Sequence, residues 1–309
     1  MDVFVGIDVS KDRLDVHILP QDETFFVERN GRGLSTLVER LRPVLPSLIV
    51  VEATGGFEST TAAALASAGL PLVIVNPAQI RHYAQALGKR AKTDPIDAMV
   101  IARFAADIRP EVRTLPDEMT QFLADLVARR RQIVEMLQGE RQREKRATIK
   151  RVKKSLARLI AALEKELAEL DQEIDDTVRG SPAWREKEDL LASVPGVGPQ
   201  TARTLLAELP ELGSLDRKTV ASLAGLAPYT RQSGRWKGKS MIAGGRKTVR
   251  SALFIAAMVA CRYNPVLKAF YDRLLKAGKS KVLAITAVAR KLLTILNAIL
   301  RDKKPWQHA

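Results

Sequence analysis

Near its amino end the chain reads Val3-Phe4-Val5-Gly6-Ile7-Asp8, an apolar run that ends in one carboxylate. A strand buried on both faces is continuously apolar, so this run is predicted to be such a strand. Because an uncompensated charge at the edge of a core is costly, Asp8 needs a cation, a hydrogen-bond donor or a proton of its own. A polar turn follows at residues 10–12, and residues 14–19 resume strand character. The first element is therefore expected to be a hairpin with the acid on its first strand.

The rest of residues 1 to about 116 predicts an α/β domain. A buried strand at 48–51 ends in a second carboxylate, Glu52, and a glycine turn follows at Gly55-Gly56. The expected order is a hairpin (3–8 and 14–19), a strand at 24–27, a helix at 33–45, the strand at 48–51, a helix at 58–69 and a strand at 72–75. This order favours a mixed sheet with crossover helices.

Composition narrows the class of protein. The chain has 309 residues, 46% of them hydrophobic, and a net charge of +15, which indicates a polyanionic partner. One cysteine, Cys261, excludes an internal disulfide and a thiolate zinc site, and we expect it to be a buried structural thiol. Three scattered histidines make a hard, oxygen-bound metal the expected kind. Because the sequence has no long apolar run and no basic leader segment, we expect a cytoplasmic protein that does not span a membrane.

The middle region, 117 to about 182, is highly charged and predicted to be helical. Its apolar positions step by four and three, the spacing of a coiled coil, and residues 141–154 are strongly basic. This pattern fits a solvated helical hairpin, or a coiled-coil stalk that dimerises or lies along nucleic acid. Gly180-Ser181-Pro182 then breaks the helix and marks a boundary. The apolar positions are Leu156, Ile160, Leu163, Leu167, Leu170 and Ile174.

The last region, 183–309, is predicted to be all α. Its first feature is the turn Pro195-Gly196-Val197-Gly198-Pro199 between two helices. A glycine turn at a helix start exposes backbone N–H groups that suit a phosphate, so Gly196 and Gly198 are candidate nucleic-acid contacts. The pattern is similar to a helix-hairpin-helix element, and a tight corner between two helices is the simpler alternative.

Four carboxylates form the first candidate centre: Asp8, Glu52, Asp94 and Asp97. Asp8 and Glu52 each follow a buried strand, and Asp94 and Asp97 share a helix face. If the two strands are neighbours, the acids converge and divalent cations such as Mg²⁺ must offset their repulsion. A metal there could polarise a phosphodiester. The alternative for Asp94 is an N-cap, with Asp97 favouring the helix dipole.

A basic loop at residues 229–240 forms the second candidate centre. No Asp or Glu occurs from Arg217 to Lys268, and Ser233 lies among cations within this stretch. A serine oxygen there could attack a phosphorus, with the arginines stabilising the developing charge. The alternative is that Ser233 only hydrogen-bonds a phosphate or caps a turn. The candidate phosphate contacts are Arg231, Arg235, Lys237 and Lys239.

Taken in order, these motifs resemble the insertion sequence 110 (IS110) family of transposases, which includes the Piv-type DNA invertases. The similarity extends over nearly the whole chain. The matching stretches are Gly6-Ile7-Asp8-Val9-Ser10-Lys11, Val51-Glu52-Ala53-Thr54-Gly55, Asn76-Pro77, Lys92-Thr93-Asp94-Pro95-Ile96-Asp97-Ala98, Pro195-Gly196-Val197-Gly198, Leu223-Ala224-Gly225-Leu226-Ala227-Pro228 and Ser233-Gly234.

The resemblance implies a RuvC-like, RNase H-type domain at 1–116, in which Asp8, Glu52, Asp94 and Asp97 hold Mg²⁺, or Mn²⁺ instead. It implies a transposase domain at 183–309 with its nucleophile at Ser233, forming a covalent 5′-phosphoserine link to DNA. The implied partners are donor and target DNA, a noncoding bridge RNA, and further copies of the chain in a dimer or tetramer.

The sequence is thus interpreted as a DNA recombinase of a mobile element. The first rival is a metal-dependent junction nuclease in which water attacks and no serine is used. The others are a non-catalytic nucleic-acid-binding protein and an actin-like or sugar-kinase ATPase, whose fold also opens on Gly6-Ile7-Asp8. Within the loop itself, Ser240 is the alternative nucleophile.

Overall fold

The structure is a computed structural model that describes residues 2–88, 94–112, 118–230, 232–233, 236–238 and 240–307, without the side chains of 94–96, 236 and 237. The chain separates into two compact units, residues 1–115 and residues 116–309. The sequence analysis placed a domain boundary near residue 116, and this stays a prediction. The further split of the second unit at 182 stays a prediction.

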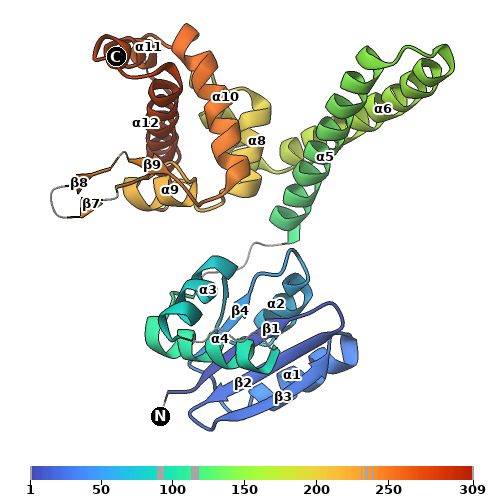
Figure 1. Ribbon diagram of the computed structural model, residues 1–309, viewed down its shortest axis with the longest axis vertical. Helices are drawn as coiled ribbons and strands as arrows, with labels where there is room; N and C mark the ends of the chain where they lie inside the picture. The colour runs from blue at the N-terminus through green and yellow to red at the C-terminus, as the bar shows by residue number, and fades with distance from the viewer. Residues whose placement is uncertain are drawn as a thin grey trace. The chain divides into compact units, whose positions relative to one another are not determined.

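The first unit is built on a five-stranded mixed sheet (Figure 1), with strand order β3-β2-β1-β4-β5. The strands are β1 (Phe4–Val9), β2 (Arg13–Leu19), β3 (Glu23–Glu28), β4 (Leu48–Glu52) and β5 (Leu72–Val75). The β1–β2 and β2–β3 pairs are antiparallel, whereas β4 runs parallel to both β1 and β5. The α/β architecture expected for residues 1–116 is therefore confirmed, with β1 at the centre.

Alternate residues of the strands serve two separate cores, one on each face of the sheet. Val5, Ile7 and Val51 pack on one face with residues of α1 (Gly31–Leu41) and α2 (Glu58–Ser67). Phe4 and Val50 pack on the other face with residues of α3 (Pro77–Ala86) and α4 (Asp94–Ile108). Because both faces are covered, the central strands are continuously apolar, as predicted.

One helix of this unit, α3, was not predicted. Asn76 and Pro77 were interpreted only as the close of a strand. Instead, the Asn76 side chain accepts a hydrogen bond from the Ala78 N–H at 2.8 Å, and Pro77 occupies the first helical position. Asn and Pro at these two positions are a helix-start signal.

The second unit begins with two long helices, α5 (Glu118–Arg146) and α6 (Lys150–Gly180), which pack against each other. The predicted apolar seam of α6 faces α5 within the same chain, since Ile160, Leu163 and Leu170 share a buried cluster with Ile133 and Leu137 of α5. We call this pair the helical hairpin. A coiled-coil stalk that dimerises stays a prediction.

The remaining helices surround the largest core of the chain. They are α7 (Pro182–Ala192), α8 (Pro199–Glu208), α9 (Arg217–Leu223), α10 (Lys247–Tyr263), α11 (Pro265–Lys276) and α12 (Lys281–Asp302). Cys261 packs against this core, partly buried, and burial raises its pKa.

The prediction of an all-α last region needs one correction. Four two-residue strands lie between α9 and α10: β6 (Pro228–Tyr229), β7 (Gln232–Ser233), β8 (Trp236–Lys237) and β9 (Met241–Ile242). They arise because this polar, glycine-containing loop folds back on itself, so that Tyr229 pairs with Met241 and Ser233 with Trp236. We call residues 228–242 the serine arm (Figure 1).

By length and composition alone, α12 could cross a membrane. In the structure one face of α12 packs into the main core of the second unit, where Val288, Leu292 and Leu296 are fully buried, whereas Val282 and Leu283 near its start are exposed. A core helix of this kind passes the same test, so α12 is explained by packing within the chain.

Candidate active site

Asp8 and Glu52 lie at the same end of neighbouring strands, and their side chains lie on the same face of the sheet. Ile7 is in register with Val51 in the parallel β1–β4 pair, so the next residues along the strands are Asp8 and Glu52. Both follow the alternation of Phe4 and Val50 and therefore belong to the α4 face. The condition set by the sequence, that these two strands be neighbours, is met. We call this end of the sheet the acid end.

Helix α4 crosses the sheet next to these acids, and Gly6 lets it approach. A Cβ atom at residue 6 would collide with backbone atoms of Ala98, Ile101 and Ala102, so only glycine fits under the helix. Asp97 lies one turn before Ile101, which is fully buried against the sheet. Side chains four apart share a helix face, so Asp97 belongs to the stripe of α4 that faces the strands.

Asp94 is the first residue of α4, but its side chain lies outside the described residues, as do residues 89–93. Among the side chains that are described, no three His, Cys, Asp or Glu groups are close enough to hold a metal ion. Asp8 and Glu52 nevertheless lie side by side, and Asp97 lies on the helix that crosses them. By donor chemistry, this all-oxygen set fits a hard divalent cation.

A further acid, Asp15, was missed by the sequence analysis. It lies directly opposite Asp8 in the antiparallel β1–β2 pair, and directly paired residues point to the same face. Its side chain is only 3% exposed and forms an ion pair with Arg13. The signal in the sequence was the alternation of Arg13, Asp15 and His17, which places three polar side chains on one face of a strand.

The loop after Glu52 is held by another residue that the sequence analysis did not single out, Glu58. Its carboxylate accepts hydrogen bonds from the backbone N–H groups of Thr54 and Gly56, both at 2.9 Å. Burial alone would raise the pKa of Glu58, but these bonds and the one from its own N–H outweigh burial and hold the pKa below its usual value. The chain leaving β4 is therefore fixed close to the acid end.

Ser233 is the central residue of the second candidate centre. It lies in β7 of the serine arm and is exposed. Ser240, the alternative nucleophile, shares a hydrogen bond of 3.1 Å with Thr230 across the arm. The predicted phosphate contacts Arg231, Arg235 and Lys239 lie outside the described residues, as does the side chain of Lys237.

The base of the serine arm is tightly packed. A Cβ at Gly225 would collide with Gly244, and one at Gly245 would collide with Gly225, so these backbones touch. The Arg250 guanidinium donates to the Gly244 carbonyl at 2.6 Å, and Arg246 forms two hydrogen bonds, 2.6 and 2.7 Å, with Glu211. Two arginines of the acid-free stretch thus hold the arm in place.

The predicted glycine turn at 195–198 joins α7 to α8. Gly196 has φ +107°, and a Cβ there would collide with Ala260 of α10, so packing explains this glycine. Gly198 is exposed at the start of α8 and is its N-cap residue. The tight-corner alternative accounts for Gly196. A phosphate contact at either glycine stays a prediction.

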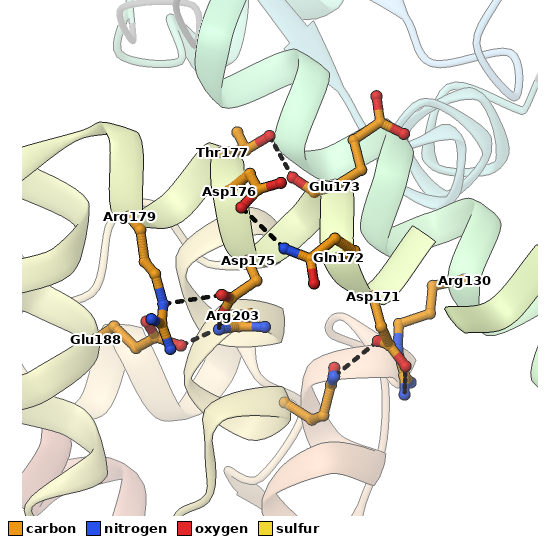
Figure 2. Close-up of polar contacts among 11 residues, drawn as sticks. Arg130, Asp171, Gln172, Glu173, Asp175, Asp176, Thr177, Arg179, Glu188 and Arg203 are labelled. Carbon is orange, nitrogen blue, oxygen red and sulfur yellow. Dashed lines mark hydrogen bonds and ion pairs between the residues drawn. The ribbon is translucent and has the colours of Figure 1, made fainter. Parts of the chain in front are cut away.

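A buried ion cluster fixes α6, α7 and α8 behind this turn (Figure 2). Arg203 donates to Glu188 at 2.6 Å and to Asp175 at 2.5 Å, with side-chain exposures of 8%, 11% and 24%. The hydrogen bond from Arg203 holds the pKa of Asp175 below its ordinary value. Nearby, Asp171 accepts hydrogen bonds from Arg130 at 2.5 Å and Gln200 at 2.9 Å.

Comparison with known proteins now identifies the chain. Sequence models of two transposase families match, one named for IS110 over residues 5–170 and one for the IS116/IS110/IS902 family over residues 188–272. Both candidate centres thus fall within matched segments, and the class of protein is a transposase, a DNA recombinase. The chain belongs to the IS110 family of transposases.

Individual relatives agree with this assignment. The pilin gene-inverting protein of Moraxella bovis is 33% identical over 314 residues, 98% of this chain and 97% of the relative. The IS110 43.6 kDa protein of Streptomyces coelicolor is 32% identical over 48% of this chain and 36% of the relative. Among solved structures, T. thermophilus RuvC in complex with a Holliday junction substrate is 16% identical, with a TM-score of 0.26, over 34% of this chain and 96% of RuvC.

Proposed function

We propose that this transposase cuts and rejoins DNA through a covalent bond to Ser233, assisted by a divalent metal at the acid end. The observation that carries the proposal is the placement of Asp8 and Glu52, side by side on the face that α4 crosses. The first turn of α4 carries Asp94 and Asp97. The family assignment is consistent with both centres, since each lies in a matched segment.

Asp8, Glu52, Asp94 and Asp97 would hold Mg²⁺, or Mn²⁺ in its place. When bound, such an ion supplies positive charge to a phosphodiester and stabilises the charge that develops during cleavage. The strands contribute two acids at fixed positions, and Glu58 orders the loop beside Glu52. The chain's own part is to hold Asp8 and Glu52 on neighbouring strands and Asp97 on the helix that crosses them.

Ser233 would carry the covalent step. Its Oγ attacks the phosphorus and the bond from phosphorus to the 3′ oxygen breaks, which leaves a 5′-phosphoserine and a free 3′ end. The serine loses its proton, and the departing 3′ oxygen takes one up. Attack by a 3′ hydroxyl of another strand reverses the exchange and returns Ser233 to its starting state. The two steps together exchange DNA strands.

Donor DNA and target DNA are the proposed substrates, with a noncoding bridge RNA as guide and a homo-oligomer as the active form. The net charge of +15 and the basic stretch 141–154 of the helical hairpin support a nucleic-acid partner. Sequencing the RNA that co-purifies with the protein tests the guide. One dominant structured species is the expected result.

The nucleophile is tested by Ser233→Ala, with Ser240→Ala as the matched control from the same arm. After reaction with DNA from the element's ends, a denaturing gel separates covalent protein–DNA adducts from free DNA. We expect Ser233→Ala to abolish the adduct while DNA binding is retained, and Ser240→Ala to keep both. If the adduct persists in Ser233→Ala and is lost in Ser240→Ala, the nucleophile is Ser240. Cleaved DNA with free ends and no adduct in the unaltered protein supports the water-based nuclease instead.

A further inference from the structure

Four arginines of the first unit lie over phenylalanine rings, and they divide between the two ends of the sheet. Arg13 lies over Phe26 and Arg29 over Phe57, with 4.4 and 4.9 Å from guanidinium carbon to ring centroid. Both pairs lie at the acid end. At the opposite end are Arg40 over Phe25 at 3.6 Å and Arg109 over Phe4 at 5.0 Å.

Arg13 lies beside a row of side chains that runs from Asp8 across the sheet. Asp8 is in register with Asp15, and Asp15 with Phe26, so the three side chains lie in one row on the same face. Arg13 precedes Asp15 by two residues on β2 and lies nearer the rim. Its guanidinium contacts the buried Asp15 carboxylate and the Phe26 ring, which is 59% exposed. Two contacts thus hold a partly exposed cation beside Asp8.

Arg29 fixes a second cation at the same rim. Its backbone N–H donates to the carbonyl of Asp12, and its Nε donates to the Lys11 carbonyl at 2.7 Å, both in the β1–β2 turn. The Phe57 ring beneath its guanidinium belongs to the loop between β4 and α2. Within the part of the chain that the structure describes, Arg29 takes part in no ion pair. Its charge is therefore not paired with any carboxylate that the structure describes in the first unit.

We propose that Arg13 and Arg29 bind backbone phosphates of the DNA strand that enters the acid end, a proposal that rests on the function given above. Cleavage there requires a polyanion to approach a row of carboxylates, which repels it. Cations on the rim offset this repulsion for the phosphates that flank the one being cut. Guanidinium groups held on rings also lose less conformational freedom when they bind than mobile side chains do.

The opposite end of the sheet supplies a matched control. Arg40 forms an ion pair with Glu23, and Arg109 with Asp2 at 3.1 Å, so these arginines also combine a ring with a polar contact. The side chains of Arg13 and Arg40 are 42% and 44% exposed. The double variants Arg13→Ala/Arg29→Ala and Arg40→Ala/Arg109→Ala each remove two positive charges that lie over phenylalanine rings. They differ in the carboxylates left behind, since Asp15 is 3% exposed whereas Glu23 and Asp2 are 47% and 56% exposed. Only the first pair lies at the acid end.

The test measures binding of the full-length variants to a labelled 30-base-pair DNA duplex in EDTA over a series of salt concentrations. We expect Arg13→Ala/Arg29→Ala to bind roughly tenfold more weakly than the control, with the slope of log affinity against log salt reduced by about 0.9 for each phosphate that the variant no longer neutralises. Thermal melting of each variant checks that it is folded. Replacing Arg29 with lysine should restore part of the affinity, because the charge is kept.

Equal losses in the two double variants would overturn the proposal, because bulk charge would then explain the effect. A loss confined to an RNA duplex of the same sequence would also overturn it, since the rim would then bind the guide rather than DNA. No strand is cut in EDTA, so the result does not depend on Ser233 or on the metal. A failed adduct assay and a failed binding assay therefore remain distinguishable.

Discussion

The acid end and the serine arm hold their functional side chains in place in different ways. Asp8 is the next-to-last residue of the six-residue strand β1 and Glu52 is the last residue of the five-residue strand β4. Both strands are covered on both faces and pair in a fixed register. Ser233 lies on an exposed two-residue strand, and in the described part of the serine arm the close packing lies at its base. The acids are thus positioned by the core of their unit, whereas the serine depends on a few contacts between glycines and arginines.

This difference predicts where each centre is sensitive to mutation. Damage to the packing of the sheet should disorder the acids together with the first unit. Damage at the base of the arm should displace Ser233 and leave the helical core of the second unit folded. Three substitutions test that contrast, in order of decreasing expected effect.

Gly6→Val should have the largest effect. The new side chain would meet the backbone of α4 at Ala98 and Ala102, which cannot move without separating the helix from the sheet. We expect a loss of at least about 3 kcal/mol of unfolding free energy in the first unit, measured by chemical denaturation. Gly31→Ala is the control, because a Cβ at Gly31 has no neighbour within 4 Å. If Gly6→Val is as stable as the control, α4 does not rest on Gly6.

Arg250→Ala should act on the arm alone. It removes the donor to the Gly244 carbonyl, which is exposed and can bond to water instead, so we expect a cost of about 1 kcal/mol. Hydrogen–deuterium exchange should rise at residues 228–242 and stay unchanged in α12. Adduct formation should fall about 100-fold, the effect of moving a reacting group by an ångström. The control is Arg262→Ala, an exposed residue of the same helix. Unchanged exchange in the arm would show that Arg250 does not hold it.

Glu58→Gln should have the smallest effect, and its size should depend on pH. The pKa of Glu58 is held below its usual value, so the folded state keeps the carboxylate ionised when the unfolded chain has taken up a proton. This stabilisation is complete above the ordinary pKa of 4.5 and is lost as pH falls through the lower folded value. We expect a cost of about 1 kcal/mol near pH 7 that shrinks toward pH 3, measured by denaturation against pH. A constant difference between variant and wild type across this range would contradict the assigned hydrogen bonds.

The sequence analysis predicted the features that depend on local pattern. Continuous apolar runs identified β1, β4 and β5, and the acids after two of them identified the acid end. The alternation of Arg13, Asp15 and His17 marked a polar strand face, but Asp15 was missed because its place beside Asp8 depends on the pairing of β1 with β2. Arg246 and Arg250 lie in the acid-free stretch from Arg217 to Lys268 that indicated a phosphate-binding loop. Their carboxylate and carbonyl partners, Glu211 and Gly244, are supplied by tertiary packing.

The ion cluster around Arg203 has a mechanical consequence for the helical hairpin. Arg203 joins α8 to α6 and α7, and Arg131 joins α5 to α8 and α10 through Glu208, 2.6 Å away, and Thr248, 3.1 Å away. These contacts therefore fix the angle between α6 and α7, so the break at Ser181 does not act as a hinge. A force on the end of the helical hairpin far from Ser181 would therefore be transmitted to α8 and α10, because these polar contacts fix the hairpin to both helices.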